Sequence, residues 1–135
     1  MSNLRLFVAL TSAIIFFSFK KDAPLDKPYK DLITSGSWTI SQMMYQGFAD
    51  TVVDYDGYTL IFTNDGEMQA INNNSISEYG KWIIFTYDEG HTFKIKIEME
   101  GDHFNYLDAM WGFASKTTSQ INLEVNLTTM TLLKN

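Results

Sequence analysis

The chain contains no cysteine among its 135 residues. This absence excludes disulfide frameworks, thiolate zinc sites and cysteine nucleophiles. Positive charge is also scarce, because the part from Asp22 onward has seven lysines and no arginine against all sixteen acidic residues, which leaves a net charge of −9. A domain this acidic repels nucleic acids and anionic membrane surfaces. We therefore expect neither of them as a partner.

The sequence also lacks the motifs of the common catalytic and metal sites. It has no Gly-x-Ser-x-Gly elbow and no glycine run that would bind a phosphate. Its two histidines, His91 and His103, fall in separate connections that we place at opposite ends of the fold, so a shared metal or catalytic pair is not expected. The aspartates Asp50, Asp54 and Asp56 could offer oxygen ligands to Ca²⁺, but their spacing is not that of a calcium loop and favours a solvated turn. We expect no enzyme activity, no cofactor and no metal.

Residues 1–21 have the layout of an export signal. A short segment with Arg5 precedes the apolar run Leu6–Phe19, which a charged stretch then ends. The run is too short to cross a bilayer comfortably as a helix. Its end resembles a bacterial lipoprotein signal in which Phe19 takes the place of the lipidated cysteine. We predict a secretory or degenerate lipoprotein signal, either cleaved or kept as a weak anchor, and a periplasmic, envelope-associated or extracellular protein.

A linker is predicted for residues 22–31. It holds both prolines of the chain, Pro24 and Pro28, among charged residues. A short helical turn over Pro28–Ile33 is the best helix candidate, because proline is favoured in a first helical turn. The folded domain is then expected to span residues 32–135.

The folded domain shows the alternation of β-strands. Phe93, Ile95, Ile97 and Met99 alternate with polar residues, so one face of this strand should be buried and the other wet. Similar runs recur between turn residues to the end of the chain. The predicted strands are Ser37–Tyr45, Tyr58–Thr63, Glu67–Asn72, Tyr79–Tyr87, Thr92–Met99, Tyr106–Ser115, Ser119–Val125 and Thr129–Leu133.

The connections between these strands favour an all-β fold, an eight-stranded up-and-down antiparallel barrel. Tight turns with glycine are predicted at Asn64–Gly66 and Asp88–Gly90. The connections after the first, third and fifth strands are longer, at Gln46–Gly57, Asn73–Glu78 and Glu100–Asn105. Alternate connections of a meander lie at one end, so we expect a closed end and an elaborated mouth. A two-sheet sandwich is less favoured, because it usually needs long crossing connections.

Several segments, taken in order, resemble the bacterial lipocalin-like domains. Gly36-Ser37-Trp38 resembles the Gly-x-Trp that opens the first lipocalin strand, and Gly57–Phe62, Gly80-Lys81-Trp82 and Leu107 with Trp111 match further along. The resemblance implies that Trp38 plugs the closed end and that the domain binds rather than catalyses. Lipocalins often cap this tryptophan with a basic residue of the last strand, commonly arginine, and here Lys134 is the only one near.

Large side chains that can point inward are the candidate ligand-binding residues. They could line a pocket for a small hydrophobic or amphipathic ligand at the mouth, or they could simply fill an eight-stranded barrel. Ile83 and Phe85 should point outward instead, where the 28–33 segment, a partner protein or a second copy could cover them. The alternative function is therefore a structural or protein-interaction module, including an inhibitor, at the cell envelope. The candidate ligand-binding residues are Trp38, Tyr58, Phe62, Trp82, Phe93, Ile95, Ile97 and Met99.

Overall fold

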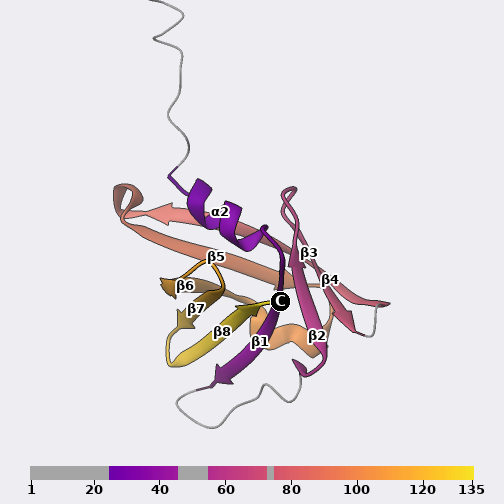
Figure 1. Cartoon of the computed structure of the whole chain (residues 1–135). Helices are drawn as coiled ribbons and strands as arrows, with labels where there is room; N and C mark the ends of the chain where they lie inside the picture. The colour runs from indigo at the N-terminus through magenta and orange to yellow at the C-terminus, as the bar shows by residue number, and fades with distance from the viewer. Residues whose placement is uncertain (1–24, 46–54, 73–74) are drawn as a thin grey trace, which may run out of the picture.

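The computed structural model describes residues 25–45, 55–72 and 75–135. Eight antiparallel strands follow one another around a closed barrel in chain order, and β8 closes the barrel against β1 (Figure 1). The prediction of an eight-stranded up-and-down barrel with a short N-terminal helix is confirmed. The strands are β1 (Ser37–Met44), β2 (Tyr58–Phe62), β3 (Glu67–Asn72), β4 (Ser75–Tyr87), β5 (Thr92–Met99), β6 (Ala109–Lys116), β7 (Gln120–Val125) and β8 (Thr128–Lys134).

Side-chain alternation decides which face of each strand enters the barrel. On β5, Ile95, Ile97 and Met99 are buried while Glu98 between them is exposed. The tight β2–β3 turn depends on Gly66, whose φ of 87° lies in the left-handed region that glycine adopts without steric cost. A backbone hydrogen bond from the Thr63 amide to the Glu67 carbonyl, 2.9 Å long, closes the turn. Local sequence thus sets both the buried face and the reversal.

The two ends of the barrel differ, although less than the sequence predicts. The closed end carries the tight connections, including the 3-10 turn η2 (Asp88–Gly90), and the mouth carries the 3-10 helix η3 (Asp102–Leu107). The third connection is not long, because Ser75 already pairs with Asn72 and leaves only residues 73–74 between β3 and β4. The register shifts by one residue after Ala70, and beyond this shift the β3–β4 pairing continues as far as Asn72 and Ser75. Only the connections after β1 and β5 are therefore long at the mouth.

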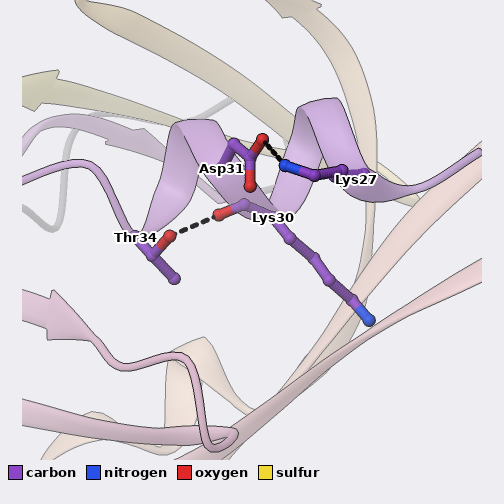
Figure 2. A network of polar contacts seen from close by, with 4 residues as sticks. All are labelled: Lys27, Lys30, Asp31 and Thr34. Carbon is purple, nitrogen blue, oxygen red and sulfur yellow. Dashed lines mark hydrogen bonds and ion pairs between the residues drawn. The ribbon is translucent and has the colours of Figure 1, made fainter. Parts of the chain in front are cut away.

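Helix α2 (Lys27–Ile33) lies at the closed end and begins inside the stretch that the sequence predicts as a linker. Proline in its first turn suits the helix start, where no amide partner is needed. Lys27 and Asp31 form an ion pair of 2.5 Å one turn apart, and the Thr34 hydroxyl donates to the Lys30 carbonyl at 2.7 Å (Figure 2). These contacts are exposed and local, so packing must hold the helix in place.

Tyr29 provides that packing. Strands β5 and β6 pair only from Lys94 to Ile97, and toward the closed end they separate. The Tyr29 ring enters this region, stacked on Phe93 with ring centroids 4.3 Å apart and tilted against Phe113 at 4.7 Å. A hollow of about 560 Å³, which these three residues help to line, lies beside the contact. The helix thus seals the barrel wall where the ladder between β5 and β6 ends.

The barrel interior is filled by large side chains, among them three buried tryptophans whose indole N–H groups all have an acceptor. Trp38 donates to the Ile33 carbonyl at 2.9 Å, Trp82 to Thr63 at 3.0 Å, and Trp111 to Leu107 at 2.9 Å. Each indole therefore buries its ring without an unpaired donor. The largest fully buried residues are Trp38, Trp111, Tyr55, Phe62, Phe104, Ile33, Met43, Leu60, Met68, Ile95, Ile97 and Leu107.

Lys134 provides the basic residue near the first tryptophan. It is the last residue of β8 and pairs in register with Trp38. Its ammonium lies 5.9 Å from the centre of the Trp38 ring and donates to the Ser35 hydroxyl at 2.7 Å. A lysine late in the last strand thus reaches the position over the ring, as the resemblance to lipocalins implies, although arginine is the common residue there.

Candidate functional site

An aromatic cluster occupies the mouth of the barrel, formed by Tyr55, Tyr58, His103 and Phe104. We call these four residues the mouth cluster. Phe104 stacks on Tyr55 with ring centroids 5.1 Å apart and meets Tyr58 edge-on at 5.0 Å. The His103 ring lies 5.4 Å from Tyr58 and 5.8 Å from Tyr55. Such stacked and edge-on contacts are the arrangements that aromatic rings prefer.

Helix η3 delivers half of this cluster. Its two buried residues, Phe104 and Leu107, enter the barrel from the mouth. Hydrogen bonds hold the connection at both ends: the Gly101 amide donates to the Glu78 carboxylate, and the Met99 amide donates to the Asp108 carboxylate at 2.6 Å. Because the two carboxylates accept backbone N–H groups, they fix the position of η3 against β4 and β5.

The outer edge of the mouth remains accessible. His103 is exposed and Tyr58 is half-buried, whereas Tyr55 and Phe104 are buried beneath them. A second aromatic pair lies at the same end, where Tyr45 and Tyr106 meet edge-on at 5.8 Å and are 44% and 46% exposed. The mouth therefore presents aromatic surface to solvent above a packed floor.

The eight candidate ligand-binding residues from the sequence do not come together at one place. Tyr58 and Met99 lie at mouth ends of their strands, while Phe62 and Trp82, 5.9 Å apart, lie toward the closed end. Phe93 is half-buried under α2. The buried members are part of the core, and their role in binding stays a prediction. They are Trp38, Phe62, Trp82, Ile95, Ile97 and Met99.

Sequence reasoning missed Tyr55 and Phe104 as members of a site. Both lie in long connections without strand periodicity, and Phe104 comes in the acidic stretch after β5. Because these connections do not alternate between apolar and polar residues, periodicity cannot predict that an aromatic side chain within them is buried. The only signal in the sequence is that mismatch, a large apolar residue among charged and polar neighbours. His103, which the sequence places at the mouth, does lie there, while His91 lies at the closed end beside η2.

A groove lies on the outside of the barrel, over the β4–β5 hairpin. Ile83 and Phe85 point outward as the sequence predicts, and Ile83 is 50% exposed. Helix α2 reaches this region through Lys30 but does not cover it. We call this hollow of about 480 Å³ the outer groove. It is lined by Lys30, Asn64, Asp65, Gly66, Lys81, Trp82, Ile83, Phe85, Lys96 and Glu98.

Two carboxylates of the outer groove are held in their charged form. A hydrogen bond from the Thr63 hydroxyl, helped by one from the Glu67 amide, lowers the pKa of Asp65. The Lys96 ammonium, 2.5 Å from Glu98, lowers the pKa of that carboxyl by hydrogen bonding and charge. Both groups are therefore negative at neutral pH, and both already have partners.

Within residues 25–45, 55–72 and 75–135, no three or more His, Asp or Glu side chains lie close enough to hold a metal ion. Asp56 is exposed, while Asp50 and Asp54 fall outside the described residues. No helix in the described part of the chain is both long and apolar enough to cross a membrane.

Comparison with known proteins gives similarity at the level of structure. No family model matches the chain, and no curated protein matches it. A DUF4847 family protein from Bacteroides vulgatus has a TM-score of 0.55 at 13% identity, covering 79% of this chain and 97% of its own. A lipocalin-like protein from Bacteroides uniformis has a TM-score of 0.54 at 15% identity, covering 76% and 99%. A protein from Bacteroides eggerthii has a TM-score of 0.52 at 14% identity, covering 74% and 98%.

Proposed function

We propose that this chain, which has the fold of the bacterial lipocalin-like barrels, is a non-enzymatic binding domain that holds a small apolar or amphipathic ligand at the barrel mouth. The observation that carries the proposal is the mouth cluster, with its exposed rim above a packed floor. Fold alone does not assign a ligand.

The filled interior limits the size and position of the ligand. Trp111 and Leu107 are fully buried beneath the mouth, and their hydrogen bond fixes both. A ligand that entered deeper would have to displace close-packed side chains, which costs several kcal/mol, about as much as removing a core side chain. We therefore propose that the ligand lies on the rim, against Tyr58 and His103.

The chemistry of the rim favours a flat, uncharged ligand. Ring faces and edges of Tyr58 and His103 offer stacking area, and the imidazole offers one polar contact. Glu100 and Asp102 next to the cluster are exposed and negative, so an anionic group would be repelled there. A neutral aromatic molecule is thus the best probe of this site.

The test is a titration of the full chain with phenylnaphthylamine, a neutral fluorescent probe, followed by fluorescence and by NMR shift mapping. We expect saturable binding with shifts confined to Tyr58, His103 and Tyr106. Replacing His103→Ala should weaken binding about three- to tenfold, the value of one aromatic contact. His91→Ala is the matched control, because His91 is also exposed but lies at the closed end. Equal losses in both variants, or shifts elsewhere, would contradict a site at the mouth.

We also propose that the chain is exported. The support is the sequence of residues 1–21, which lie outside the described residues. An intact-mass measurement on protein from the envelope and culture fractions of its host tests this. A full-length chain found only in the cytosol would count against export.

A further inference from the structure

We propose that the outer groove binds a single-chain amphiphile with an anionic head, such as a long-chain fatty acid, independently of the mouth. The groove and the mouth lie on different parts of the barrel, one over the outer face of β4 and β5 and the other at its open end. The proposal does not depend on a ligand at the mouth.

The floor of the groove is apolar. Ile83 and Phe85 alternate with inward-facing residues on β4, so their side chains lie side by side on the outer surface. Trp82 adds to the lining at the β2–β3 turn, where its indole hydrogen-bonds the Thr63 carbonyl. A volume of about 480 Å³ lies within the range of small-molecule sites, roughly 300–1,000 Å³. An alkyl chain would bind to this floor, because burying its apolar surface away from water lowers the free energy.

Lysines surround that floor on both sides. Lys81 and Lys96 stand on β4 and β5, and Lys30 stands on α2, so three of the seven lysines after residue 22 line one hollow. Glu98 lies between two of them, ion-paired with Lys96 and influenced by the charge of Lys81. The Glu98 carboxylate is thus influenced by the charge of two lysines but forms an ion pair with Lys96, and no ion pair of Lys81 is found within the described part of the chain. The carboxylate head of an amphiphile would give Lys81 an ion-pair partner.

Lys30 completes the rim from the opposite side. In Figure 2 its side chain extends away from the Lys27–Asp31 pair and over the neighbouring ribbon. Its ammonium is 3.0 Å from the Asp26 carboxylate, and the Lys30 side chain remains 48% exposed in this pair. A long flexible side chain can therefore keep its stem along the apolar floor and its charge at the edge, where an anionic head would lie.

A monomeric amphiphile fits these observations better than a membrane. The domain from Asp22 onward carries −9, which opposes approach to an anionic bilayer as a whole. The apolar surface is also recessed between α2, the β2–β3 turn and the sheet, rather than raised above it. A hollow of this kind admits one chain more easily than a flat interface.

The experiment compares two probes with the same tail and opposite heads. Dodecanoate and dodecyltrimethylammonium are each titrated into the full chain below their micelle concentrations, with calorimetry for affinity and NMR for location. We expect dodecanoate to shift residues 63–66, 81–85 and 96–98. The cationic probe should bind about fivefold more weakly, because it loses an exposed charge pair worth about 1 kcal/mol.

Matched variants separate the tail contact from the head contact. Ile83→Glu should weaken dodecanoate about tenfold or more, because it removes a large apolar contact and adds a negative charge. Leu127→Glu, at an exposed leucine on the β7–β8 turn, makes the same chemical change away from the groove and should have no effect. Lys30→Gln should weaken dodecanoate about two- to fivefold, whereas Lys27→Gln on the same helix should not.

Three results would overturn the proposal. Equal affinity for dodecanoate and dodecyltrimethylammonium would show that the lysines do not select an anionic head group. Dodecanoate shifts centred on Tyr58 and His103 would place the amphiphile at the mouth instead. Binding of anionic vesicles or of a protein partner by the Ile83 surface, with no binding of monomeric dodecanoate, would assign the groove to a different occupant. The proposed ligand site at the mouth is tested separately, by phenylnaphthylamine binding and the His103→Ala variant. Either proposal can therefore fail while the other holds.

Discussion

Replacing Tyr29→Ala should destabilise the whole barrel, although Tyr29 belongs to a helix of seven residues outside it. The Tyr29 ring stacks on Phe93 at 4.3 Å and contacts Phe113 at 4.7 Å, at the place where β5 and β6 separate. Lys116 lies over the same ring, 4.9 Å from its centre. Alanine would remove all three contacts and open the wall at that point.

The magnitude follows from those contacts. Two aromatic pairs are worth about 0.5–1.5 kcal/mol each, and an exposed cation–π contact is worth about 0.5–1 kcal/mol. The sum is about 1.5–4 kcal/mol, and 4 kcal/mol is an upper limit because the ring is half-buried and part of its surface stays in contact with water. With a urea m-value of about 2 kcal/mol per molar, which is typical of a small protein, the unfolding midpoint should fall by about 1–2 M.

Urea unfolding followed by tryptophan fluorescence measures this change. Tyr29→Phe is the control, since it keeps the ring and should lose less than about 1 kcal/mol. A double-mutant cycle with Phe93→Ala should give a coupling energy of about 1 kcal/mol, because the two rings are in contact. An alanine variant as stable as the parent would show that α2 does not seal the barrel.

Two further predictions concern the tight turns at the closed end. Glu89→Gly should stabilise the protein by about 0.5–1 kcal/mol. Glu89 has φ 56° and ψ 32°, a left-handed conformation that costs a non-glycine residue about 1–2 kcal/mol. Glycine removes this cost, but its greater conformational freedom in the unfolded chain offsets part of the gain. Glu124→Gly, in a strand, should instead lose about 0.5–1 kcal/mol, and urea midpoints compare the two. Asp65→Asn should flatten the fall in urea midpoint on acidification below about pH 4. The pKa of Asp65 is lowered from its ordinary value of 3.8, so its stabilisation is complete above that value and lost as pH falls through the lower folded pKa.

A specific result would contradict each of these two predictions. If Glu89→Gly and Glu124→Gly shift the midpoint in the same direction, backbone strain at residue 89 is not what limits the turn. If Asp65→Asn and the parent lose stability in parallel down to pH 2, the hydrogen bonds from Thr63 and Glu67 do not stabilise the charged carboxylate in the folded protein.

Much of the barrel could be predicted because its signals are local. Alternation along β5 decides which side chains enter the core, and Gly66 decides where the chain reverses after β2. These effects act over two to four residues, so they can be read without a partner strand. The outward direction of Ile83 and Phe85 follows from the same period of two.

The errors in the prediction come from register and packing, neither of which an alternation pattern contains. The β3–β4 connection is short because Asn72 pairs with Ser75 beyond a register shift, and no composition pattern marks that shift. Sequence placed the start of β6 at Tyr106, but residues 102–107 form η3, because Phe104 and Leu107 gain more by entering the mouth than by extending a strand.

By itself, then, the sequence determined the fold class, the order of the strands, the faces they bury and the end at which each histidine lies. Tertiary structure alone decided that Tyr55 and Phe104 meet at the mouth, that Lys134 reaches Trp38, and that lysines of α2, β4 and β5 surround one apolar floor. The physical reason is the distance along the chain over which each kind of interaction acts. Periodicity and turn chemistry act between neighbours along the chain, whereas a site forms only where closure of the barrel brings together side chains from separate elements.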